Sequence, residues 1–339
     1  MLGELLPIIK GPVPASPPRR PFSIRRTSTI DTRWPDGMGG NMLQIGAARD
    51  LLTRDEIDDP RIVVLDRFEI KLSQAREILQ ISATPDRPDL PALMGARAGG
   101  HLRSAIINAL PAEVAAGTPL YLLLDDVGGA SLVAPFAWAQ WNEETKQQIT
   151  ASLDLGGLRH KMAGVCIGFA PGSPALDSSR ETLKQNDEVP PLGRDGDPHA
   201  WHELVDWHEV SARRARCIDV WFEDEDVVIQ AFFQDSAATQ SGERRAVHEY
   251  LLYARADRRS GTLQALSAEP RILPFDVCPA AIFNIGRMVG TPLGDLRQAV
   301  VEKLPRTDGC THLNDTIRSL AEVPQLSVVL AEAVSSSAS

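Results

Sequence analysis

The chain contains 339 residues, of which 43% are hydrophobic and 24% charged, a composition typical of globular proteins with room for two domain cores. Its formal net charge of −10 argues against binding to nucleic acid, because contact with phosphates requires a basic surface. Four cysteines are too few for a disulfide framework and favour a reducing, cytoplasmic location.

The chain divides into five predicted segments. The N-terminal residues lack the basic segment and the long apolar run of a secretory signal. Residues 1–23 are rich in proline, which cannot sustain a helix, and we expect a disordered arm there. No later stretch reaches the roughly 20 apolar residues of a membrane span, so no membrane partner is expected. The other segments are a first domain copy (24–146), a connecting region with a mobile polar loop (147–210), a second copy (211–334) and a disordered tail (335–339).

An internal repeat underlies the two predicted copies. Three pairs of segments match in the same order along the chain, which favours duplication over chance similarity of amphipathic pieces. We therefore predict an α+β fold built from two related units, each running strand, strand, β-hairpin and helices. The pairs are RRTSTIDTRW from Arg25 with RRARCIDVW from Arg213, QIGAARD ending at Asp50 with QAFFQD ending at Asp235, and GARAGGHLRSAIINALP from Gly95 with GTPLGDLRQAVVEKLP from Gly290.

Within these copies, alternating and β-branched residues predict strands at RIVVLDRFEIKL and REILQISA in the first copy. In the second copy, RRSG lies between two apolar runs and predicts a hairpin turn, with Gly261 supplying a positive φ. The segments from Ala92, from Pro279 and from Asp295 show helical spacing. Between the copies, KMAGVCIGF reads as a strand, and Cys166 within it is expected to lie in the core.

The second copy carries polar residues that the first copy lacks. Cys278 aligns with Leu90, and GCTHLND, from Gly309, has no counterpart. Cys278 and Cys310 stand at predicted helix starts, where free amides and the helix dipole favour a thiolate. His312 and Asp315 are three residues apart and would share a helix face, so the carboxylate could orient the imidazole.

These residues predict one constellation with three interpretations. As a metal site, it would bind zinc or iron through cysteine, histidine and carboxylate ligands. As a thiol site, it would use a cysteine nucleophile with a histidine base and an orienting carboxylate. Alternatively, the cysteines are only packed in the core. The metal set is Asp276, Cys278, His248, Cys310 and His312, and the catalytic set is Cys310, His312 and Asp315.

Two further groups of polar residues are expected to be structural. Asp31 and Asp219 occupy the same place in both copies, as do Asp50 and Asp235, so capping of turns or strand ends is favoured over catalysis. HAWHELVDWHE, from His199, lacks the HExxH pattern of zinc proteases. Its tryptophans are expected to pack and its histidines to face outward.

RRTSTIDTRWPDG, AARDLLT, LPFDVCPAA and GCTHLND together resemble an uncharacterised bacterial family, a domain of unknown function with Gly-Cys-Thr-His-Leu near its C-terminus. The resemblance spans most of the chain. Members often lie beside genes for breaking down aromatic or steroid acyl-CoA compounds, which implies a catabolic role. Residues His248 to Val323 also resemble iron–sulfur scaffold proteins, with Cys278 and Cys310 at two of the cysteine positions. The scaffold's first cysteine is missing, and the candidates to replace it are His248 and Asp257.

The function expected from the sequence is a metal- or thiol-dependent enzyme that acts on a small organic molecule. Hydration, lyase cleavage and hydrolysis all fit the predicted residues. The alternatives are a non-enzymatic module that binds or delivers a metal or iron–sulfur cluster, and an accessory subunit. A homo-oligomer or a complex with a partner enzyme subunit is compatible with each of these functions.

Overall fold

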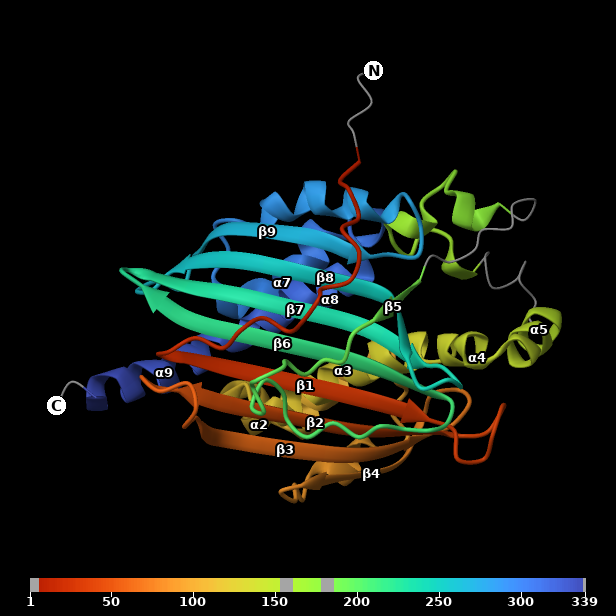
Figure 1. Ribbon diagram of the computed structural model, residues 1–339, viewed down its shortest axis with the longest axis horizontal. Helices are drawn as coiled ribbons and strands as arrows, with labels where there is room; N and C mark the ends of the chain where they lie inside the picture. The colour runs from red at the N-terminus through yellow and green to blue at the C-terminus, as the bar shows by residue number, and fades with distance from the viewer. Residues whose placement is uncertain (1–5, 153–160, 178–185, 338–339) are drawn as a thin grey trace.

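A computed structural model describes residues 6–152, 161–177 and 186–337. Within these residues, one antiparallel sheet of nine strands runs through the molecule, with helices packed behind it in Figure 1. The predicted α+β class is therefore confirmed. The strands are β1 (Ser23–Arg33), β2 (Met42–Thr53), β3 (Arg61–Leu72), β4 (Ile78–Thr84), β5 (Asp187–Val189), β6 (Ser211–Glu223), β7 (Asp226–Ala238), β8 (Arg244–Asp257) and β9 (Leu263–Ile272).

The strand order is β4-β3-β2-β1-β6-β7-β8-β5, and β9 also pairs with β8. The chain therefore forms two consecutive four-stranded halves, β1 to β4 and β6 to β9, which join through β1 and β6 at the centre (Figure 1). The predicted strands of the first half are found as β3 and β4. The predicted hairpin turn lies between β8 and β9, where Gly261 has a φ of +67°.

The α-helices cover one face of the sheet (Figure 1). Their amphipathic sequences bury apolar side chains against the strands in two clusters, one for each half of the sheet. None of the helices in the described part of the chain is long and apolar enough to cross a membrane. The α-helices are α1 (Leu102–Ala109), α2 (Pro111–Ala116), α3 (Pro119–Val133), α4 (Phe136–Trp141), α5 (Glu143–Ser152), α7 (Leu296–Lys303), α8 (Thr311–Ser319) and α9 (Val323–Ser337).

Short 3₁₀ helices complete this layer. The longest, η4 (Cys278–Met288), follows β9 and packs against it. Residues 161–169, predicted to form a strand, are instead helical at 161 and 162 and then form a turn, in which Gly164 has a φ of +73°, and η2 (Ile167–Phe169). The remaining 3₁₀ helices are η1 (Leu90–Leu93), η3 (Pro174–Leu176), η5 (Leu293–Asp295), η6 (Arg306–Asp308) and η7 (Leu320–Glu322).

The opposite face of the sheet is covered by irregular chain. Residues 6–22, within the stretch expected to be a disordered arm, run extended across the strands, and the Val13 amide donates a hydrogen bond of 2.6 Å to Glu249. Arg19 donates to both carboxylate oxygens of Asp197, at 2.8 and 2.7 Å. Residues 178–185 of the expected mobile loop lie outside the described residues. Of the expected tail, α9 includes residues up to Ser337, and residues 338–339 lie outside the description.

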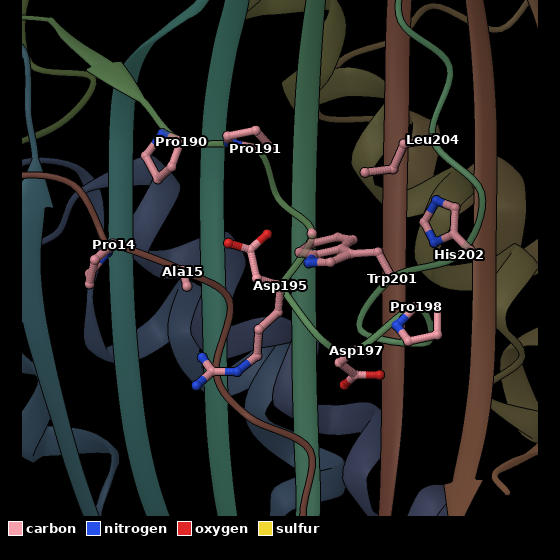
Figure 2. A pocket seen from close by; sticks show the side chains of 12 residues that line it. Pro14, Ala15, Pro190, Pro191, Asp195, Asp197, Pro198, Trp201, His202 and Leu204 are labelled. Carbon is pink, nitrogen blue, oxygen red and sulfur yellow. The ribbon is translucent and has the colours of Figure 1, made fainter. Parts of the chain in front are cut away.

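A groove of about 590 Å³ lies on this irregular face, between the N-terminal arm and the segment before β6 (Figure 2). Trp201, at its wall, is buried, as its sequence pattern predicted. His202 is buried as well, which corrects the expectation that the histidines of this segment face outward. Its imidazole lies between the hydroxyl groups of Thr27 and Thr29.

Candidate metal centre

Two strands and one helix bring Asp235, His248 and His312 together on the helix-covered face. Asp235 on β7 lies directly opposite His248 on β8, immediately before a β-bulge. The Asp235 Oδ2 atom is 3.5 Å from His248 Nδ1 and 3.6 Å from His312 Nε2. The two imidazole rings are stacked, with their centroids 3.4 Å apart. One ligand atom from each residue lies within 4.8 Å of the other two, a spacing that could hold a metal ion.

The start of α8 positions His312. Cys310 is the N-cap residue, and its carbonyl accepts the first helical hydrogen bond from Asn314 at 2.8 Å. Leu313 and Ile317 pack into the hydrophobic core and fix the rotation of the helix. This rotation brings His312 to the sheet, where it contacts the ring of Phe233 at a centroid distance of 6.0 Å.

Arg214 holds the carboxylate of Asp235 in place. Its guanidinium donates to both oxygens, at 2.8 and 3.0 Å, and both side chains are buried. Burial would raise the pKa of Asp235, but Arg214, with His248 and His312, holds that pKa well below its usual range. The carboxylate is therefore ionised and pre-oriented, as a metal ligand must be.

His312 is held in its neutral form. Burial, together with the neighbouring His248, lowers the pKa of the His312 imidazole well below its usual value, against the opposing effect of Asp235. A neutral imidazole has a free lone pair, which is the form that ligates metals. The stacked histidines and the ionised carboxylate therefore match the charge state of an imidazole–carboxylate metal site.

The predicted thiolate at the start of α8 is not supported. Cys310 Sγ lies 3.9 Å from His312 Nδ1, so the cysteine and histidine do come together. Burial nevertheless raises the pKa of Cys310 to about 11, although hydrogen bonds from Tyr250 and from the amides of His312 and Leu313 oppose this rise. Burial also raises the pKa of Cys278. Both thiols are protonated at neutral pH, because the loss of solvation outweighs the helix terminus.

The structure separates the predicted constellation. Asp315 pairs with Arg214 at 3.3 Å and with Arg103 at 3.4 Å, while the carboxylate against His312 belongs to Asp235. Asp276 is exposed and is not part of the imidazole–carboxylate group. Cys278 is buried in the core cluster of the second half. Of the predicted metal ligands, His248 and His312 thus meet, and Asp235 is the third residue of this group, which sequence reasoning missed.

Asp235 belongs to a set of buried arginine–aspartate pairs. Both aspartates of the repeated motif pair across the central junction, Asp219 with Arg25 at 2.6 Å and Asp31 with Arg213 at 2.6 Å. These cross-strand ion pairs replace the predicted capping roles. Asp50 pairs with Arg26 at 2.7 Å, as Asp235 pairs with Arg214 at 2.8 Å.

A family model described as "Protein of unknown function (DUF2889)" matches residues 212–325. The matched stretch contains Asp235, His248 and His312. No curated protein and no solved structure matches this chain.

Proposed function

We propose that this protein is a metal-dependent enzyme that binds zinc or iron through Asp235, His248 and His312. The observation that carries this proposal is the convergence of one carboxylate and two imidazoles from separate elements, with their ligand atoms within 4.8 Å of one another. A set of two histidines and one carboxylate is typical of catalytic zinc and of non-haem iron, because it leaves coordination positions open.

The chemistry is water-based hydration, lyase cleavage or hydrolysis. A bound ion would polarise a substrate carbonyl or lower the pKa of a water molecule. Arg214 fixes the orientation of Asp235 through two hydrogen bonds. Cys310 Sγ and Thr311 Oγ1 lie near His312 Nδ1, at 3.9 and 3.3 Å, and leave Nε2 facing Asp235. These contacts favour Nε2 as the ligating nitrogen of His312.

The substrate is proposed to be a small organic molecule. The side chains of His248 and His312 are only 10% and 14% exposed, so only a narrow approach reaches them. An aromatic or steroid acyl compound, implied by the family resemblance, would approach with its acyl end first. The same low exposure favours a second candidate, a non-catalytic module that stores or delivers the metal.

Metal analysis of protein purified without chelator tests the proposal. We expect one equivalent of zinc or iron in the wild type and less than about a tenth of that in His312→Ala, since two ligands hold a divalent ion poorly. His208→Ala is the matched control, because His208 is exposed and belongs to the opposite face. Wild-type protein without metal, or a His312→Ala variant with full occupancy, would refute the site.

Activity measurements separate the two candidates. An enzyme should hydrate or hydrolyse members of an acyl-thioester panel only when the metal is bound, and His312→Ala should abolish turnover. A delivery module should show no turnover but should transfer its metal to a chelator quickly. Transfer without turnover would replace the enzymatic proposal with the second candidate.

We also infer that the two halves of the sheet are copies of one unit. The register shift next to Asp50, where Val63 of β3 is the extra residue, corresponds to the shift next to Asp235, where Val247 of β8 is the extra residue. The ion pairs of the central junction are reciprocal, since each copy contributes one arginine and one aspartate. In the first half Val64 lies opposite Asp50, whereas in the second half His248 lies opposite Asp235. The first copy therefore has the carboxylate but not the imidazole.

A further inference from the structure

Helix α3 contains two adjacent glycines in its interior, Gly128 and Gly129. Glycine destabilises the interior of a helix relative to alanine, because it loses more backbone entropy on folding. Two glycines in a row therefore weaken α3 unless the packing around the helix requires them.

The two glycines differ in what surrounds them. A Cβ atom at Gly128 would make ordinary contacts, the nearest at 3.5 Å from the backbone nitrogen of Gly99. A Cβ atom at Gly129 would overlap the Nη1 atom of Arg214 and would lie 2.9 Å from its Cζ atom. The packing therefore requires glycine at position 129 and tolerates a side chain at position 128.

Every nitrogen of the Arg214 guanidinium contacts a carboxylate. Nε and Nη2 donate to Asp235, at 2.8 and 3.0 Å. Nη1 donates to Asp315 on α8 at 3.3 Å and lies 3.6 Å from Asp126 on α3. The side chain is only 2% exposed, and its Cζ atom lies 5.1 Å from the ring centroid of Phe233. Because the guanidinium is planar and rigid, a shift of Nη1 moves the two nitrogens at Asp235 as well.

This guanidinium orients a residue of the candidate metal centre. Asp235 Oδ2, which accepts from Arg214 Nη2, is the atom that lies 3.5 Å from His248 Nδ1 and 3.6 Å from His312 Nε2. A carboxylate that ligates a metal depends on hydrogen bonds from neighbouring groups, and losing such a partner weakens metal binding roughly 10- to 100-fold. The space at Gly129 therefore bears on how well Asp235 can hold an ion.

We propose that Gly129 is a positioning residue for the metal centre, and that α3 thereby completes this centre. The missing side chain leaves the space in which Arg214 Nη1 lies between Asp126 and Asp315. Helix α3 packs mainly on β1, β2 and β3 of the first half, and it lies outside residues 212–325, which the family model matches. The first half thus supports a site whose three residues all belong to the second. This inference rests on the proposed function, since it requires an ion at Asp235.

Arg26 in the first half offers a matched control. Its Nε and Nη2 atoms donate to Asp50, both at 2.7 Å. Its Nη1 atom donates to the carbonyl of Gly117 at 2.8 Å and to Glu322 at 3.0 Å. The two arginines are held alike, but Asp50 is not part of the imidazole–carboxylate group. A change at Arg26 should therefore disturb a similar ion pair without disturbing the metal centre.

Zinc titration of the full chain, in competition with a colorimetric zinc indicator, tests the proposal. Gly129→Ala should bind zinc at least about tenfold more weakly than the wild type, and Gly128→Ala should stay within about twofold of it. Circular dichroism should show that both variants fold, because Arg214 Nη1 is the end of a flexible side chain and can yield. Equal zinc affinity in the two variants would overturn this inference and leave the metal centre intact. A wild type that binds no zinc would overturn both.

A second comparison shows whether Gly129 acts through Arg214. Arg214→Lys keeps the charge but loses the paired donors, so it should weaken zinc binding about tenfold, and adding Gly129→Ala should change the affinity less than about twofold further. Arg26→Lys should bind zinc as the wild type does. The visible spectrum of bound cobalt, which reports ligand geometry, should change in Gly129→Ala and not in Gly128→Ala.

Three results of these measurements would overturn the proposal. The first is full zinc affinity in Arg214→Lys, and the second is a further large loss when Gly129→Ala is added to it. The third is a Gly129→Ala chain that does not fold, because the glycine would then be required by the packing of α3 itself and not by the position of Arg214.

Discussion

A single buried imidazole, that of His202, makes the stability of the fold depend on pH. His202 Nδ1 lies 2.9 Å from Thr27 Oγ1, and its Nε2 lies 2.8 Å from Thr29 Oγ1. Burial, reinforced by the charges of Arg49 and Arg213, lowers the pKa of His202 to about 3. The folded protein therefore keeps this ring neutral at pH values where the unfolded chain binds a proton.

The expected consequence is acid sensitivity that depends on His202. Because its folded pKa is depressed below the usual 6.5, its contribution to stability is complete above about pH 6.5 and falls as the pH drops toward 3. Between pH 7 and pH 5, the wild type should lose about 2 kcal/mol more of its free energy of unfolding than His202→Gln. Urea titrations at both pH values measure this difference, and parallel losses in the two proteins would contradict it.

Two of the three residues of the candidate metal centre, His248 and His312, could be predicted from the sequence, and Asp235 could not. His312 and Cys310 were predicted to come together because they are two residues apart at a helix start. His248 was a candidate because the resemblance to iron–sulfur scaffold proteins lacks its first cysteine there, and a histidine could replace it as a ligand. Asp235 was assigned a structural role because Asp50 shares its position in the repeat. Its contact with His248 depends on the register of the β7–β8 hairpin, which the sequence pattern alone does not set.

At the scale of elements, the β1–β6 pairing depends on two reciprocal ion pairs. Arg25 donates to both oxygens of Asp219, at 2.6 and 2.7 Å, and Arg213 donates to both oxygens of Asp31, at 2.6 and 2.8 Å. All four side chains are buried. A buried bidentate pair stabilises this strand register mainly because a shift in register would leave each charge unpaired in the interior, at a high cost in free energy.

Removing one partner should therefore cost more than removing both. Arg25→Met leaves the Asp219 carboxylate buried without its ion-pair partner and should lower the free energy of unfolding by about 3–5 kcal/mol. The double variant Arg25→Met/Asp219→Leu should recover much of that loss. Arg255→Met, at the exposed pair with Glu223, is the control and should change stability little. Denaturant unfolding of the four proteins measures these values, and a double variant worse than Arg25→Met would contradict the argument.

Across the whole molecule, one continuous sheet and shared helices join the two halves. The C-terminal α9 contacts both β1 and β6, and Glu322 of the second half pairs with Arg26 of the first at 3.0 Å. The element order within each half was predictable from alternation and helical spacing. The junction was not, because pairing between strands nearly 190 residues apart leaves no local signal.

This continuity predicts cooperative unfolding. Circular dichroism and tryptophan fluorescence should report the same urea midpoint. If either half unfolded, the pairing of β1 with β6 would break, and the core and the buried charges of the other half would become exposed. Tryptophans occur in both halves, so fluorescence samples each of them. Two separated transitions, or midpoints that differ between the two probes, would show that the halves fold independently.

The reciprocal junction also has a consequence for assembly. Strand β1 of one molecule can pair with β6 of another molecule in the same backbone register and with the same two ion pairs that join β1 and β6 within one chain. Two partly opened chains could therefore trade halves and close again with every interaction of the junction intact. Refolding at high concentration should yield an exchanged dimer with native spectra, and dilution under native conditions should release monomers only slowly.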